Sequence, residues 1–393
     1  MSTADQDAPF EDETDGVEAE DTTPTDNPKP FDPRQVRVDQ KPMSVDLIIR
    51  RIKHNEIDLA PAFQRKGGIW KDREQSRLIE SLMIRIPIPA FYVDASDEAD
   101  GAKWVIVDGL QRMTALSRFI VTKELRLCEL EFLGRDLNGM TFDELPRAMQ
   151  RRIEETQLVV YTLEPGTPPE VKFNVFKRIN TGGLPLSLQE IRHALNQGPA
   201  VQLLEDLADS SEFARATAGS LKHDKRMNDR ECVLRFMAFS SGGWLKYRTP
   251  NFDYFLSTAL KHLNSLSDPD RAKLAERLKR ALRAAHAILG RHAFRKLYDA
   301  QEKKRRPISK ALFEAWTVAF DAFSDEQLAM LVARRDKVLE AFAGLMLTKD
   351  FEDAVSAGTG DPKRVNERFR SLHELIAVVL LNTADNEAPH DTA

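Results

Sequence analysis

Residues 105–116 read Val-Ile-Val-Asp-Gly-Leu-Gln-Arg-Met-Thr-Ala-Leu, and this stretch decides the fold of the first half of the chain. Three β-branched residues predict a strand, and the Asp-Gly pair after them predicts a tight turn. From Leu110 onward, apolar residues recur at the spacing of a helix. The stretch therefore predicts a strand that turns directly into a helix.

The corner between this strand and this helix gathers polar side chains suited to an anion. Asp108, Gly109, Gln111 and Arg112 lie within five residues of one another. Backbone N–H groups and the helix dipole favour a negative ligand at such a corner, and the planar guanidinium of Arg112 matches a phosphate. Asp108 could hold a metal or orient a water. A plainer explanation stays open, in which Asp108 caps the helix and Arg112 forms a surface ion pair.

A second loop carries a Gln-Arg pair. Gln64 and Arg65 follow a short expected strand, and Gly67-Gly68 and Trp70 come next. Glycines allow close approach of a ligand to the backbone, and an indole can stack on a base. The alternative is a loop whose tryptophan only anchors the next helix.

A third loop follows an expected helix. Arg178, Asn180 and Thr181 precede Gly182-Gly183, which supply exposed amides at a chain reversal. An ordinary glycine helix end would need only one of the two glycines. Each of the three loops presents an arginine beside an amide at an element boundary. Together they predict a phosphate pocket, provided that they converge.

Composition and charge bound the class of protein. The 393 residues are 42% hydrophobic and 30% charged, as in ordinary globular proteins. No apolar run has the length of a membrane span, and the acidic start is unlike a signal peptide, so we expect a cytoplasmic protein with no membrane partner. Cys128 and Cys232 fit no disulfide or metal spacing.

The net charge of −5 is distributed unevenly. Residues 1–32 carry eleven acidic side chains and one lysine, and the last ten residues carry three more acidic side chains. The chain between these two tails, which we call the body, therefore has a net charge of about +8. A basic body is compatible with a polyanionic partner, and an acidic tail could compete for the same surface. The alternative is that the tails are only solvating.

The pattern predicts an α+β chain with four parts: a disordered acidic tail over 1–38, a mixed α/β domain over 39–197, an all-α helical domain over 198–383 and a disordered tail over 384–393. In the first domain we expect strands at 57–59, 91–93, 103–107, 127–132 and 157–163, and helices at 45–54, 72–85, 110–122, 146–154 and 170–179. Ser187 and Glu190 predict a capping box on the next helix. In the second domain we expect helices at 200–209, 230–240, 252–263, 269–289, 310–320, 325–342 and 361–381.

Several chemistries lack their motif. The sequence contains no Gly-x-x-x-x-Gly-Lys-Ser/Thr loop, no Gly-x-Ser-x-Gly elbow and no His-Glu-x-x-His. The eight histidines are scattered, and no paired-His nuclease motif is found in the helical half.

The ordered series of motifs adds a resemblance. It runs Pro-x-Phe-Gln-Arg (61–65), Leu-Ile-Glu-Ser-Leu (78–82), Ile-Pro-Ile-Pro (86–89), Val-Asp-Gly-x-Gln-Arg-x-Thr-Ala-Leu (107–116), Phe-x-Arg-Ile-Asn-Thr-Gly-Gly-x-Pro-Leu (176–186) and Gln-Glu-Ile-Arg (189–192). This series resembles the N-terminal domain of GmrSD-type, modification-dependent restriction endonucleases. That family is related to the ParB/sulfiredoxin-like fold and carries an Asp-Gly-Gln-Gln-Arg signature.

The resemblance implies nucleoside triphosphate binding and hydrolysis, coupled to DNA cleavage in antiviral defence. Carried over by position, the implied site residues are Gln64, Arg65, Asp108, Gly109, Gln111, Arg112, Arg178, Asn180 and Thr181. Leu110 stands where the signature has its first glutamine, and no C-terminal His-Asn-His nuclease motif is found.

We therefore expect Asp108, Gln111 and Arg112 to be catalytic, with Asp108 also the candidate ligand of Mg²⁺. Gln64, Arg65, Trp70, Gly109, Arg178, Asn180 and Thr181 would bind the nucleotide and its phosphates. The implied partners are the nucleotide, DNA, a separate nuclease subunit and a second copy of the chain in a homo-oligomer. The alternative is a non-catalytic DNA-binding or regulatory module that recruits the nuclease.

Overall fold

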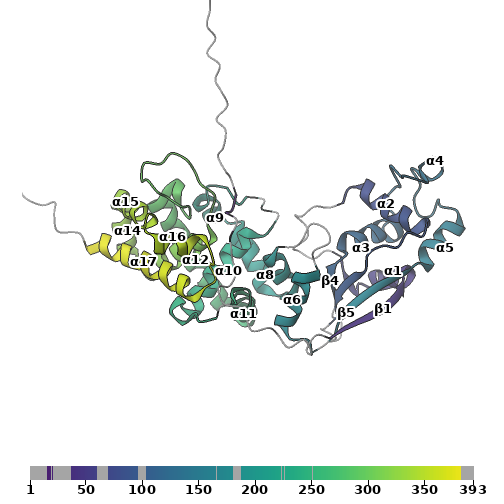
Figure 1. Ribbon diagram of the computed structural model, residues 1–393, viewed down its shortest axis with the longest axis horizontal. Coiled ribbons are helices and arrows are strands. Elements are labelled where there is room, and N and C mark those ends of the chain that lie inside the picture. Colours follow the sequence, from purple (N-terminus) through teal and green to yellow (C-terminus); the bar gives the residue numbers. More distant parts are fainter. Residues whose placement is uncertain are drawn as a thin grey trace, which may run out of the picture. The chain divides into compact units, whose positions relative to one another are not determined.

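The computed structural model describes residues 16–18, 20, 37–59, 70–95, 103–164, 166–179, 187–222, 224, 226–249 and 251–381. These residues fall into two compact units (Figure 1). The sheet unit comprises Lys29–Gln197 with Lys225–Met227, and the helical unit comprises Met1–Pro28, Gly198–Asp224 and Asn228–Ala393. The predicted α+β fold with a helical second part is confirmed.

The sheet unit is built on five strands in the order β1-β5-β3-β4-β2. Their bounds are β1 (Val38–Ser44), β2 (Ile57–Asp58), β3 (Phe91–Asp94), β4 (Trp104–Asp108) and β5 (Gln157–Leu163). β1 pairs antiparallel with β5 and β3 with β4, whereas β3–β5 and β2–β4 are parallel. The sheet is therefore mixed, with β3 and β4 near its centre.

Helices cover both faces of this sheet. Its helices are α1 (Val45–Lys53), α2 (Asp72–Met83), α3 (Leu110–Leu116), α4 (Gly134–Leu137), α5 (Arg147–Glu155), α6 (Pro169–Ile179) and α7 (Leu188–Leu195), and a π-helical turn, Ser117–Val121, continues α3. Ile106 of β4 packs with α1, α2 and α3, whereas its neighbour Val107 packs with α6 and α7. Successive strand residues face opposite sides, so the end of β4 is flanked by helices on each side.

β1 is a strand that the sequence did not predict. Its residues are mostly polar, and Pro42 lies opposite Val159 of β5. Proline has no N–H to donate, so it is tolerated in an edge strand whose pattern is not that of a core strand. Ser44 then ends β1 and caps α1, because its Oγ accepts the Leu47 N–H at 3.2 Å.

The strand predicted over residues 127–132 is wrong. The Leu127 N–H donates to the Met140 carbonyl, which lies outside any strand, and side chains accept most of the N–H groups that follow: Ser76 Oγ accepts from Cys128 N at 3.1 Å. The carboxylate of Glu80 accepts from the N–H groups of Glu131, Phe132 and Leu133 at 2.9, 2.7 and 2.7 Å. Polar side chains of α2 therefore hold this loop in place. An alternating pattern of apolar and polar residues cannot show such contacts.

Replacing Glu80 with glutamine should destabilise the protein by about 1–3 kcal/mol, because three N–H donors would lose a charged acceptor. Burial alone would raise the pKa of Glu80, but the three backbone hydrogen bonds outweigh it and lower that pKa. The stabilisation is thus present above the unfolded-state pKa and is lost as pH falls through the lower folded value. Urea denaturation of both proteins at pH 7 and pH 3 measures this difference.

The matched control is Glu155→Gln, because Glu155 is exposed at the end of α5. Its effect should stay within about 0.5 kcal/mol. Equal stability of the Glu80 and Glu155 variants at pH 7 would contradict the role assigned to Glu80.

The helical unit has one large apolar core. Its helices are α8 (Pro199–Ala208), α9 (Ser211–Ala216), α10 (Asn228–Gly242), α11 (Phe252–Ser265), α12 (Asp268–Leu289), α13 (Lys310–Ala322), α14 (Asp325–Ala333), α15 (Arg335–Met346), α16 (Lys349–Ser356) and α17 (Pro362–Leu381). α10 and α13 pack together at the centre, with α8 and α11 against α10 and α12 and α17 against α13. None of the described helices is both long and apolar enough to span a bilayer.

Two expectations for this unit are corrected. The helix expected over 325–342 is two helices that part at Arg334, whose guanidinium donates to the Val379 and Leu380 carbonyls of α17. The tail expected to be disordered contains residues with a defined place: Val17 forms a β-bridge with Ile308, and Glu20 is paired with Arg235. The ordered residues of the tail are explained by their pairing with a buried cation, Arg235, whose position the composition of the sequence cannot indicate.

Candidate functional site at the end of β4

The corner predicted from residues 105–116 is present. β4 ends at Asp108, Gly109 makes the turn in a left-handed conformation (φ 100°), and α3 begins at Leu110. The side chain of Asp108 is 38% exposed, so the corner presents a carboxylate to solvent. Asp108 does not cap α3 through its side chain, so that part of the plainer explanation is wrong.

Gly109 is required by its surroundings as well as by its φ angle. A Cβ at this position would lie 2.5 Å from Cδ1 of Phe91 and 3.3 Å from Nη2 of Arg112. The absence of a side chain therefore lets the turn press against the ring and the guanidinium. The glycine of the signature sets the geometry of both neighbours.

Gly109→Ala should destabilise the protein by about 2–4 kcal/mol, the sum of backbone strain and a steric clash. Gly139→Ala is the matched control, because Gly139 also has a positive φ (87°) but no atom within 4 Å of a new Cβ. That variant should lose only about 1–2 kcal/mol. Thermal and urea denaturation measure both values, and equal losses would show that contact with Phe91 contributes nothing.

Arg112 is buried and bonded to the protein on several sides. Its Nη2 donates to Asp108 Oδ2 at 2.8 Å and to the Ala90 carbonyl at 3.2 Å, and its Nη1 donates to the Pro89 carbonyl. The guanidinium carbon lies 4.6 Å from the centre of the Phe91 ring. Burial lowers the pKa of Arg112, and the charge of Asp108 opposes this change. The arginine thus positions Asp108 from the interior of the unit, rather than lying in a surface ion pair.

Gln111 connects the corner to the segment that contains Trp70. Its Oε1 accepts the Trp70 N–H at 3.1 Å, and the Trp70 carbonyl accepts from Gln75 Nε2 at 2.8 Å. Gln75 Oε1 in turn accepts from Arg118 Nη1 at 2.8 Å. The amide of Gln111 therefore fixes the chain just before α2 beside the start of α3.

Tyr92 is a residue of this corner that the sequence analysis missed. It is the β3 partner of Asp108, and its ring stacks on that of Tyr161 with the centroids 4.9 Å apart. Burial raises the pKa of Tyr92, and the charges of Tyr161 and Asp108 raise it further. Side chains alternate between the two faces of a strand, and Phe91 and Val93 pack in the core on the α1–α3 side of the sheet. This alternation could have placed Tyr92 on the opposite face of β3.

The remaining predicted residues are placed only in part. Arg178 is exposed at the end of α6. Gln64, Arg65, Asn180 and Thr181 lie outside the described residues, so their convergence on the corner stays a prediction. The predicted capping box is confirmed, with Glu190 N donating to Ser187 Oγ at 3.1 Å and Ser187 N donating to the Glu190 carboxylate.

The described residues contain no group of three or more histidine, cysteine, aspartate or glutamate side chains arranged to hold a metal ion. Asp108 is the partly exposed carboxylate at the corner, and Arg112 bonds to one of its two oxygens. Mg²⁺ bound with a nucleotide commonly takes one or two carboxylates and completes its shell with phosphates and water. Asp108 is the described carboxylate at the corner that could serve as such a ligand, so the Mg²⁺ site stays a prediction.

Comparison with known families places this part of the chain. Residues 47–196 match the family model described as GmrSD restriction endonuclease, N-terminal domain. The resemblance is confirmed, and this stretch is a domain of the GmrSD N-terminal type. No curated protein and no solved structure matches the chain significantly, so the ParB/sulfiredoxin-like fold stays a prediction.

Proposed function

We propose that the sheet unit binds and hydrolyses a nucleoside triphosphate at the end of β4, and that the chain acts in a DNA restriction system. The family match of residues 47–196 supports the restriction role. The observation that carries the nucleotide site is the anchoring of two loops beside Asp108. Both loops carry residues of the family pattern.

The first loop, residues 60–69, has both ends tied to the corner. It leaves β2, which pairs with β4 through Ile57–Trp104 and Asp58–Val105. It returns at Trp70, whose N–H is bonded to Gln111. The described segments on both sides of this loop are therefore held by the strand–helix unit that carries Asp108.

The second loop, residues 180–186, joins two helices that pack on the same end of the sheet. Phe176 of α6 and Ile191 of α7 share one apolar cluster with Val107, the residue before Asp108. Lys172 of α6 also lies 3.2 Å from Asp94 of β3. The two helices that flank the loop with Asn180 and Thr181 therefore both pack against β4.

In this proposal each group at the corner has a task. Water attacks the terminal phosphorus, the bond from that phosphorus to the bridging oxygen breaks, and a nucleoside diphosphate and inorganic phosphate leave. Asp108 would hold Mg²⁺ or orient the water, and Gln111 would orient the water. When bound, Mg²⁺ neutralises phosphate charge. Arg65 and the exposed Arg178 contact the phosphates, while Arg112 contributes fixed positive charge beneath Asp108.

Asp108→Asn should lower nucleotide hydrolysis by about 10²-fold or more, because removal of one preorganised charged contact typically costs that much. Labelled nucleoside triphosphates are incubated with Mg²⁺ and each protein, and released phosphate is counted. The matched control is Asp136→Asn in α4, an exposed aspartate away from the corner, whose rate should equal that of the wild type. A wild-type protein that neither binds nor hydrolyses any of the four nucleotides would overturn this proposal.

A second function is favoured by Leu110. Its side chain is buried in the core beneath the corner, where the family signature has a glutamine. The corner thus lacks one polar group, and three donors of Arg112 are occupied by protein oxygens. A module that binds DNA without catalysis and recruits a separate nuclease would tolerate both features.

Salt titration separates the two functions. Binding through DNA phosphates should weaken steeply between 50 and 200 mM salt, with a loss of 10³-fold or more for about six contacts. A compact nucleotide pocket should weaken much less over the same range. Fluorescence anisotropy with a labelled duplex and with a labelled nucleotide measures both slopes on the same protein.

A further inference from the structure

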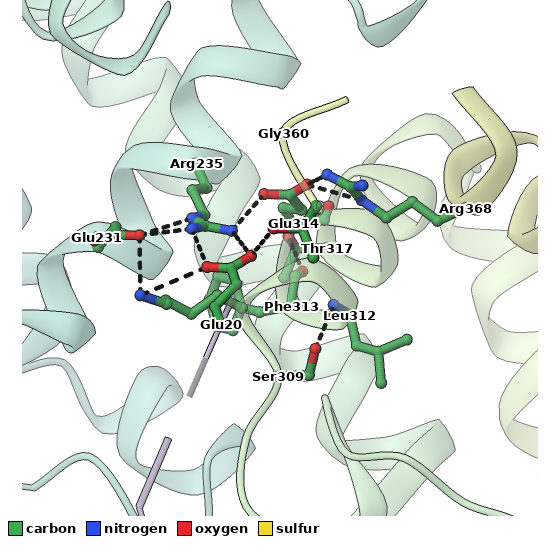
Figure 2. Close-up of polar contacts among 12 residues, drawn as sticks. Glu20, Glu231, Arg235, Ser309, Leu312, Phe313, Glu314, Thr317, Gly360 and Arg368 are labelled. Atoms are coloured by element: carbon green, nitrogen blue, oxygen red, sulfur yellow. Dashed lines mark hydrogen bonds and ion pairs between the residues drawn. The ribbon is translucent and has the colours of Figure 1, made fainter. Parts of the chain in front are cut away.

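A buried ionic cluster lies in the helical unit (Figure 2). Arg235 of α10 donates from Nε to Glu231 at 3.0 Å and from Nη1 to Glu314 of α13 at 3.3 Å. Arg368 of α17 donates from Nε to the same Glu314 at 2.9 Å. Lys310 lies 3.1 Å from Glu231. Four side chains from three helices thus hold one another in place around Arg235.

Glu20 joins this cluster from the far end of the sequence. Its two carboxylate oxygens accept from Nη1 and Nη2 of Arg235 at 2.9 and 2.5 Å. Lys310 lies 3.6 Å from the same carboxylate, and the Thr359 hydroxyl donates to it. The side chain of Glu20 is 8% exposed. A bidentate pair buried to this degree is a fitted contact, unlike an ion pair on the surface.

The backbone just before Glu20 forms an isolated parallel β-bridge, between Val17 and Ile308. Ile308 N donates to the Gly16 carbonyl at 2.9 Å, and Glu18 N donates to the Ile308 carbonyl at 2.8 Å. Lys296 Nζ donates to Glu18 at 2.6 Å. Main-chain pairing along one edge, with pockets for every second side chain, is how extended peptides are recognised.

Charge balance shows that the pocket needs this occupant or another anion. Arg235, Lys310 and Arg368 face Glu231, Glu314 and Glu20. Among the residues that the structure describes, three buried cations would face two carboxylates without Glu20, and an uncompensated buried charge is costly. Burial alone would raise the pKa of Glu20, but the charge and hydrogen bonds of Arg235 outweigh it and lower that pKa.

We propose that this pocket is a binding site for an acidic peptide with glutamates two residues apart, and that the chain fills it with its own Glu18 and Glu20 as a tethered ligand. Arg235 also bonds to Glu231 and Glu314, and Arg368 bonds to Glu314, so these side chains keep partners besides Glu20. The backbone pairing with Ile308 favours a peptide over a simple anion. A segment of the same pattern from another protein, or from a second copy of the chain, would compete for the site.

The test uses a dye-labelled peptide of residues 14–24 and two full-length proteins, the wild type and an E18Q/E20Q double variant. In the wild type the tethered segment competes at an effective concentration of the order of mM, so the peptide should bind the variant at least about tenfold more tightly. Fluorescence anisotropy measures both affinities, and circular dichroism verifies that the variant is folded.

Two controls define the chemistry. A peptide with glutamine at both positions should not bind either protein. In the double-variant background, Lys310→Met should abolish binding of the acidic peptide, whereas Lys273→Met, at a side chain 78% exposed on α12, should not. Equal binding to wild type and double variant, no binding to either, or displacement by inorganic phosphate as potent as by unlabelled peptide would each overturn the proposal.

If the double variant does not fold, the same question is asked of the wild-type sequence with a protease site inserted between residues 24 and 28. After cleavage, the fragment should stay bound at high protein concentration and should be displaced by excess acidic peptide. Unfolding of the remaining chain upon loss of the fragment would show that residues 16–20 are part of the fold and not a ligand.

Discussion

The fold of the sheet unit and its candidate site both depend on how Arg112 is buried. Its guanidinium lies over the ring of Phe91 and is largely shielded from water. It is bonded to Asp108 and to the two carbonyls that precede β3. A charge at this depth is tolerated only where oxygens match it. Gly109 leaves room for it, since a Cβ there would meet both the ring and the guanidinium. The turn, the end of β4 and the orientation of Asp108 are therefore one arrangement.

Local sequence predicted much of this arrangement, because its causes are local. The strand and helix on either side of Asp108 and Gly109 and the capping box at Ser187 rest on residues within four positions of one another. β5 was predicted with its observed bounds, Gln157–Leu163, because its buried residues largely alternate. Spacing is sufficient where the partner of each group lies nearby in the chain.

The features that the sequence did not yield depend on partners far away in the chain. The N–H groups of residues 131–133 bond to Glu80, and Tyr92 meets Asp108 only through strand pairing. Glu20 was read as one of many acidic residues in a tail, and its partner Arg235 is 215 positions later. Net charge by segment indicated that an acidic tail could compete for a basic surface, but it could not say which residue or where.

Arg112 and Arg235 follow the same rule with different consequences. Each is buried, each lies over a phenylalanine ring, and each is matched by carboxylates. At the corner the carboxylate that matches Arg112 is that of Asp108, four residues earlier. Folding of β4 and α3 therefore completes this ion pair and leaves Asp108 partly exposed for a ligand. In the helical unit one matching carboxylate comes from a remote segment, so the pair is completed only when that segment binds. Burial of its charge thus makes Arg112 a fixed support for Asp108. The same burial makes Arg235 the centre of the proposed peptide site, in which Glu20 can be exchanged for another carboxylate.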